Sequence, residues 1–301
     1  MTSQNRATKE IIPWDVLCAK TVTILRSIER KWQALIEAPT VKESHIHKFL
    51  SDHSGLFFGQ DVFVISKAEL GSDFQADFVV ASDEASYGID YKFVEIETPQ
   101  CGIYTRRGDP SARLTHAIQQ VLNWKAWLTR HRGHVRKFFP SQYYGWDEFT
   151  NLSFCIVIGR RSSQASTMAK RNAFARQMGV SIRSFDYLTE MLRLRSDFLW
   201  NLTPHEEGSR PGRMALNQLA NPFARAYSWQ AWKQVVGERH LENAHFVAHN
   251  AERLLAHRTY SKESDSFLRW WHSLPARKKS EYKSAGLKWE GLGKMWIQFD
   301  R

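Results

Sequence analysis

Three acidic side chains in the first third of the chain have the spacing of a site that holds a divalent cation. Asp77 falls in the run of residues 75–81, and Glu95 and Glu97 fall in the run of residues 89–97. Both runs are rich in β-branched and aromatic residues, which predicts strands. Side chains alternate along a strand, so Glu95 and Glu97 are expected on one face.

Neighbouring carboxylates create a chemical conflict that a metal ion resolves. Two such groups beside a packed layer repel each other and lose hydration when they are buried. A hairpin with its loop near residues 85–88 brings Asp77 beside Glu95, and the three acids then converge with the oxygen ligands that Mg²⁺ or Mn²⁺ prefers. The alternative is that Asp77 and Glu97 lie at strand edges and form solvated ion pairs with Lys and Arg.

Glu43 has two interpretations. With Thr40 it forms a capping-box pattern, in which a Glu at the third helical position reaches back to the N-cap amide. Alternatively, Glu43 projects from the start of its helix into the acidic site as a further ligand, directly or through water. His45 and His47 follow on the same helix. We expect both on the surface, with His45 as the alternative candidate for a water-activating base.

Apolar spacing predicts the elements that must position these acids. Pro13 can occupy the first turn of the first helix, and Asp186 is expected to cap the last one. In chain order the expected spans are helices 13–39 and 40–53, strands 61–70, 75–81 and 89–97, helix 111–129, strand 152–158, helix 164–178, strand 180–185 and a helix from 186 to about 200. This order predicts the α/β class, with a mixed sheet flanked by helices.

The chain divides into three predicted parts. A polar, breaker-rich stretch between Thr203 and Gly212 marks a boundary. We expect an N-terminal helix at residues 1–37, an α/β domain at 38–202, and a smaller, mainly helical C-terminal region at 213–301. That last region is basic and Trp-rich, and we assign it to sensing, assembly or regulation.

Composition favours a polyanionic partner such as DNA. The 301 residues carry a formal net charge of +11, and Lys and Arg release counterions when they contact phosphates. No apolar run approaches the roughly 18 residues that span a bilayer. The first ten residues lack the apolar segment of a secretory signal, so a cytoplasmic protein without a membrane partner is expected. Cys18, Cys101 and Cys155 have no CxxC spacing and are expected to be reduced.

Short motifs between residues 38 and 200 resemble the nuclease domain of Shedu antiphage defence proteins, which belongs to the PD-(D/E)XK superfamily. The resemblance implies a restriction-endonuclease-like fold, metal-dependent cleavage of DNA, prokaryotic defence against phage with an unknown phage-derived trigger, and assembly into a homo-oligomer. The motifs are Glu43 with Phe49-Leu50, Asp77-Phe78-Val79-Val80, residues 93–99 (FVEIETP), residues 117–124 (AIQQVLNW), residues 156–160 (IVIGR) and residues 185–188 (FDYL).

The resemblance also implies roles for individual residues. Asp77 and Glu95 would ligate Mg²⁺ or Mn²⁺ together with the backbone carbonyl of Ile96, and Glu43 would be the helix acid. Glu97 is a further candidate ligand only from the convergence of the three acids, not from the resemblance. It departs from the family motif, which usually has Lys at this position.

That Lys helps to orient or deprotonate the attacking water and stabilises charge on the phosphate. Three explanations of its absence follow. Glu97 brings in a second cation; a Lys from elsewhere, such as Lys67 on the first predicted strand, enters the site; or cleavage has been lost and a DNA-binding or effector-sensing protein remains. The first two are preferred, because an inactive site has little need for an extra buried acid.

Two further groups complete the candidate site. Gln120 with Trp124 resembles the Gln-x-x-x-Tyr pattern of related nucleases, which implies that Gln120 holds the metal-bound water or a phosphate. Otherwise Gln120 is a polar residue on a solvated helix face. Arg106, Arg107 and Arg113 follow the acidic strand and are candidate contacts to the DNA backbone, or else solvated charges.

Overall fold

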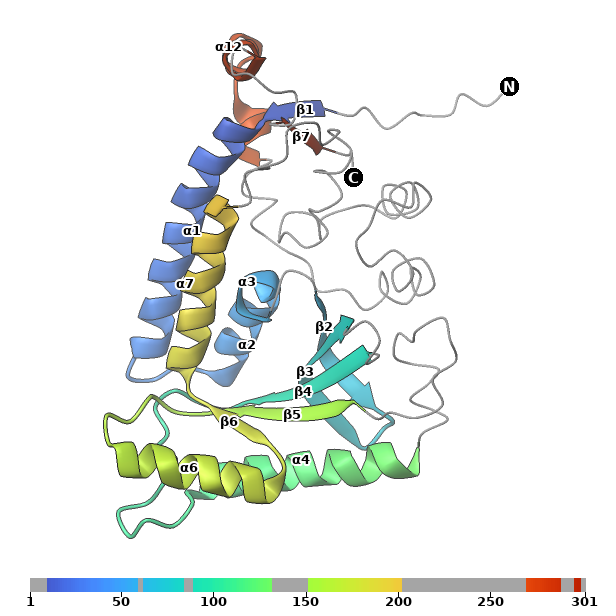
Figure 1. Cartoon of the computed structure of the whole chain (residues 1–301), viewed down its shortest axis with the longest axis vertical. Helices are drawn as coiled ribbons and strands as arrows, with labels where there is room; N and C mark the ends of the chain where they lie inside the picture. The colour runs from blue at the N-terminus through green and yellow to red at the C-terminus, as the bar shows by residue number, and fades with distance from the viewer. Residues whose placement is uncertain are drawn as a thin grey trace.

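The computed structural model describes residues 10–58, 62–83, 89–131, 151–201, 269–287 and 295–298, around a five-stranded mixed sheet (Figure 1). The strands β2 (Val62–Leu70), β3 (Phe74–Asp83) and β4 (Ile89–Ile96) are antiparallel neighbours. The strands β5 (Leu152–Val157) and β6 (Ser181–Arg183) continue the sheet parallel to β4. The predicted α/β class and mixed sheet are therefore confirmed.

Helices cover both faces of the sheet (Figure 1). One face carries α4 (Ala112–Arg130) and α6 (Ala165–Met178), and the other carries α1 (Trp14–Glu37), α2 (Glu43–Asp52), α3 (Ser54–Phe58) and α7 (Phe185–Asn201). Val79 and Phe93 pack in the apolar cluster on the α4 side. Phe78 and Val94, their chain neighbours, pack in the cluster with α1 and α7. Alternation along the strands thus produces a three-layer structure.

The long helix α1 belongs to the same core as the sheet. Ile28 and Trp32, at the predicted apolar positions, are buried, and they share a cluster with residues of β3, β4 and α7. The indole Nε1 of Trp32 donates a hydrogen bond to Thr189 Oγ1 of α7 at 2.9 Å. This buried hydrogen bond joins α1 to α7, the two longest helices of that layer. It also leaves no polar atom of the Trp32 side chain unpaired.

A two-stranded ribbon joins the ends of the described chain. The strand β1 (Glu10–Pro13) pairs antiparallel with β7 (Met295–Gln298). The expectation that Pro13 lies in the first helical turn is therefore wrong, because it ends β1 and α1 begins at the next residue. The C-terminal region contains the predicted helical structure in α12 (Ala276–Leu287) but also the unpredicted β7. Residues 202–268, with the predicted boundary, lie outside the described part.

Other boundaries shift by a few residues. Asp186 does not cap α7 but lies in its first turn, where its carboxylate accepts hydrogen bonds from Arg160. The strand β6 is shorter than predicted and pairs only with Cys155 to Val157 of β5. The first half of β5 therefore has no partner in β6, which begins opposite Cys155. Cys101 and Cys155 are free thiols. Among the helices of the described residues, none is both long and apolar enough to cross a membrane.

Candidate metal centre

The register of the β3–β4 hairpin brings Asp77 beside Glu95. Phe78 pairs with Val94 at the end of this ladder, so Asp77 follows at the next position, beside Glu95. Asp77 Oδ2 accepts a hydrogen bond from the backbone N–H of Ile96 at 2.8 Å. Asp77, Glu95 and Glu97 are only 6%, 7% and 5% exposed, so they are not solvated. The alternative is nevertheless confirmed in part, because Asp77 pairs with Lys67 and Glu97 with Arg113.

Burial and mutual repulsion dominate the electrostatics of this cluster. The pKa of Glu95 is raised from 4.5 to about 9, first by burial and then by the charges of Asp77, Glu97 and Glu43. The charge of Lys67 acts in the opposite direction. The four carboxyl groups, which come from α2, β3 and the end of β4, therefore repel one another. Without added positive charge they resist full ionisation near neutral pH.

Helix α2 supplies Glu43 through its first residue. The N-cap of α2 is Lys42, and it makes no side-chain capping bond. The capping-box interpretation is therefore wrong, because the helix begins three residues later than Thr40 and Glu43 is not at its third position. The pKa of Glu43 is raised by burial and then by the charges of Asp77 and Glu97. The second interpretation, in which Glu43 joins the acidic site, agrees with this position.

Lys67 of β2 reaches Asp77 through an irregular stretch of backbone. Among the described residues it is the one non-glycine with positive φ, at 51°. Ser66 pairs with Phe78 and Ala68 with Ala76, so the ladder is interrupted at Lys67 and Asp77 without a change of register. The Lys67 ammonium forms an ion pair with Asp77 Oδ1. A lysine from another strand thus contacts the acidic cluster.

His47 of α2 contacts the backbone at the point where the β2–β3 ladder is interrupted. Its Nε2 lies 3.2 Å from the backbone oxygen of Asp77, and its ring stacks on Phe78 with centroids 4.5 Å apart. Burial lowers the pKa of His47. The expectation of a surface position is wrong for His47, whereas His45 is exposed as expected. The sequence does contain a signal for the position of His47, because it follows Glu43 by four residues and therefore shares its helix face.

Helix α4 reaches the cluster through Arg113. Ser111 caps this helix by accepting a hydrogen bond from the N–H of Leu114 at 3.3 Å. Arg113 Nη1 then donates to Glu97 Oε2 at 3.2 Å. The sequence suggests Arg113 as a contact to DNA. In the structure its guanidinium pairs with the carboxylate of Glu97. Arg106 and Arg107 are exposed, and their contact with DNA remains a prediction.

Gly159 fixes the segment that follows Glu97. Its φ is +64°, and a Cβ at this position would lie 2.3 Å from the backbone oxygen of Cys101. The N–H of Gly159 donates to Thr98 O at 3.0 Å, and its own carbonyl accepts from Phe185 N–H at 3.0 Å. Only glycine allows this close approach without displacement of the backbone beside the site.

Gln120 lies on the same face of α4 as Arg113, about two turns further along. Its Oε1 is buried and has no hydrogen-bond partner among the described residues. The alternative of a fully solvated side chain is therefore wrong. Trp124, one turn beyond, is buried in the core on the α4 side. Within the described part of the chain, no hydrogen bond joins Gln120 Oε1 to the acids, so its role at the site remains a prediction.

The donor set fits a hard divalent cation in its chemistry. Among the described residues, no three His, Cys, Asp or Glu side chains are already arranged to hold a metal ion. The Asp77 carboxylate binds Lys67 and the Ile96 N–H, and Glu97 binds Arg113. The carboxylates nevertheless offer only oxygen donors, and a cation would relieve the repulsion that raises the pKa of Glu95.

Comparison with known families identifies this region. Residues 40–189 match the family model described as Shedu protein SduA, C-terminal. This part of the chain belongs to the Shedu family. The Shedu match spans about half of the chain and includes Glu43, Lys67, Asp77, Glu95 and Glu97. Shedu membership suggests a role in antiphage defence. No curated protein matches the chain.

Proposed function

We propose that this protein is a metal-dependent deoxyribonuclease of the PD-(D/E)XK type that acts in antiphage defence. The observation that carries the proposal is the buried pair Asp77 and Glu95, opposite each other on β3 and β4 within a Shedu region. The mixed sheet between two helical layers supports a restriction-endonuclease-like fold. DNA as substrate, a cytoplasmic location and assembly into a homo-oligomer are parts of the same proposal.

Asp77 and Glu95 would hold Mg²⁺ or Mn²⁺ with the backbone carbonyl of Ile96. The bound cation lowers the pKa of a water molecule and neutralises charge on the phosphate. Glu43 extends this acidic set from α2, and its raised pKa makes it a better proton acceptor for an attacking water than an ordinary glutamate. Gln120 would hold a water or a phosphate oxygen through its buried amide.

In this proposal, Lys67 replaces the lysine that the Shedu resemblance leads us to expect at position 97, and it stabilises charge on the phosphate. Its ammonium already contacts Asp77, and a phosphate bound beside Asp77 would come within its reach. Preorganised positive charge next to a developing oxyanion is among the largest contributions to catalysis. The alternative, a second cation at Glu97, is less favoured because Arg113 already matches the charge of Glu97.

A second candidate function is DNA binding without cleavage. One observation favours it: Lys67 and Arg113 neutralise two of the acids within the chain itself, and such pairs can be purely structural. In that case DNA binding would depend on salt but not on divalent metal. The net charge of +11 supports DNA binding under either function.

A cleavage assay separates the two functions. Linear, nicked and circular DNA would be incubated with the full-length protein and Mg²⁺ or Mn²⁺, and compared with Asp77→Asn, Glu95→Gln and Glu97→Gln. Glu69→Gln is the matched control, because Glu69 is an exposed acid on the same hairpin. Cleavage lost in the Asp77 and Glu95 variants but kept in the control supports the nuclease. DNA binding by the wild type without cleavage of any substrate would support the second function.

A further inference from the structure

A cavity lies beside β5 and β6, and its lining includes residues of both apolar clusters. It has a volume of about 500 Å³, within the range of roughly 300–1,000 Å³ that small-ligand sites occupy. Its floor includes Val94 and Cys155, which belong to the cluster with α1 and α7. Residues 152–154 of β5 line it, and they have no partner in β6, because the pairing of the two strands begins at Cys155 and Ser181.

Positive charge is concentrated in this cavity. Lys92, Arg176 and Arg183 line it, and none of the described residues in its lining is acidic. Lys92 of β4 and Arg183 of β6 both act on the buried thiol of Cys155, whose pKa burial raises and their charges lower. The two cations therefore face one region from different strands. Within the described residues neither forms an ion pair with a carboxylate, so their charge is available to an anion.

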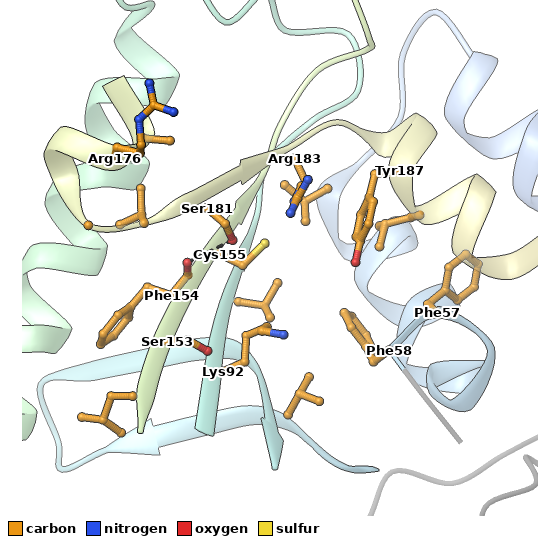
Figure 2. Close-up of a pocket in the computed structure, with 18 residues that line it drawn as sticks. Phe57, Phe58, Lys92, Ser153, Phe154, Cys155, Arg176, Ser181, Arg183 and Tyr187 are labelled. Carbon is orange, nitrogen blue, oxygen red and sulfur yellow. Dashed lines mark hydrogen bonds between the residues drawn. The ribbon is translucent and has the colours of Figure 1, made fainter. Parts of the chain in front are cut away.

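Aromatic rings face these cations across the cavity. Figure 2 shows Lys92, Cys155 and Arg183 on one side and Phe58 and Tyr187 on the other. The Arg183 guanidinium lies 5.0 Å from the centroid of the Tyr187 ring. Phe58 and Tyr187 are half-buried, so neither side chain is fully covered by the described residues. Ser153 and Ser181 add hydroxyl groups to the same lining.

We propose that this cavity binds a nucleoside phosphate, either as a free nucleotide or as the terminal nucleotide of a DNA strand. The base stacks against Tyr187 and Phe58, and the phosphate binds Lys92 and Arg183. Stacking of bases on aromatic side chains and charge-assisted hydrogen bonds to phosphate are the two interactions that this lining offers. The site is separate from the acidic cluster, because none of Asp77, Glu95 and Glu97 lines it.

Binding is tested on the full-length protein in EDTA, so that a metal-dependent site does not contribute. The probes are dAMP, inorganic phosphate and a 5′-phosphorylated tetranucleotide, measured by calorimetry. We expect saturable binding of dAMP or the tetranucleotide. Lys92→Ala and Arg183→Ala should each weaken it about tenfold, the equivalent of one good contact. Tyr187→Leu should weaken dAMP binding while leaving that of inorganic phosphate unchanged.

Arg130→Ala is the matched control, since Arg130 is an exposed cation in the last turn of α4. It should change affinity by less than about twofold, and all variants should unfold at the wild-type temperature. If the tetranucleotide binds more tightly than dAMP, the ligand of the cavity is the end of a DNA strand. If dAMP binds more tightly, the ligand is a free nucleotide. The proposal is overturned if no probe binds saturably, or if Arg130→Ala weakens binding as much as Lys92→Ala and Arg183→Ala.

Discussion

Lys67 and Asp77 face each other across the β2–β3 hairpin, and their ion pair lies where the ladder of that hairpin is interrupted. The left-handed backbone of Lys67 costs roughly 1–2 kcal/mol relative to ordinary strand geometry. Removing the partner of a buried carboxylate costs more than that. The irregular conformation therefore persists because it delivers an ammonium group to the acidic cluster.

Replacement of Lys67 tests whether this ammonium takes part in cleavage. Lys67→Met should reduce the single-turnover rate of DNA cleavage about a hundredfold or more, because the phosphate loses a preorganised positive charge. Lys67→Arg should keep part of the rate. Lys31→Met, at an exposed lysine of α1, should leave the rate unchanged.

A rescue variant separates a relocated lysine from a second cation. Adding Glu97→Lys to Lys67→Met should restore part of the lost rate, because a lysine then returns to the acidic cluster from β4. Were Glu97 instead needed to bring in a second metal ion, the double variant would be slower than Lys67→Met alone. That outcome would favour a second cation at Glu97 over a relocated lysine.

The pH dependence of stability tests the repulsion among the acids. The pKa of Glu95 is about 9 in the folded protein, against an ordinary value of 4.5. The folded state therefore holds one more proton than the unfolded state between these values. The stability that this carboxyl contributes is present below pH 4.5 and is lost progressively as the pH rises towards 9.

Glu95→Gln removes this loss. In EDTA, the variant should gain stability over the wild type between pH 5.5 and pH 8, by about 1–3 kcal/mol in denaturant unfolding. The exposed control Glu69→Gln should show no such trend. A Glu95→Gln difference that stays constant with pH would mean that Glu95 is not held protonated by its surroundings.

Local sequence signals predict much of this arrangement. The features that they do not predict depend on tertiary structure or on unusual backbone geometry. The alternation of apolar residues in residues 89–97 predicts the shared face of Glu95 and Glu97, and the turn that follows Ala81 predicts the hairpin with Asp77. The positive φ of Lys67 leaves no such signal, because lysine has no preference for left-handed backbone. The pairing of β1 with β7 joins segments nearly 300 residues apart, and only tertiary structure determines it.

Gly159 is predicted to be essential for the geometry beyond β4. Gly159→Ala adds a Cβ close to Cys101 O at a positive φ, and it should destabilise the protein by about 2–4 kcal/mol. Gly102→Ala is the control, since its Cβ would lie 3.4 Å from Tyr104 O, an ordinary contact. Thermal unfolding of both variants checks the prediction, and equal unfolding temperatures would contradict it.

The turn after the acidic strand is predicted to bind the DNA backbone. Arg106 and Arg107 are exposed there, and the double replacement by Ala should weaken DNA binding for all sequences alike. The slope of log affinity against log salt should fall by about 2, because two phosphate contacts are lost. Fluorescence anisotropy over a salt series measures this slope. An unchanged slope would place the DNA elsewhere on the surface.

The central claim is that Asp77 and Glu95 form a metal-dependent catalytic site. The most direct test is the single-turnover rate of DNA cleavage as a function of Mg²⁺ concentration, for the wild type and for Asp77→Asn with confirmed folding. We predict that the wild-type rate rises to saturation with Mg²⁺ and vanishes in EDTA, and that Asp77→Asn is slower by at least about a hundredfold. Cleavage that persists in EDTA, or equal rates for the two proteins, would contradict the claim.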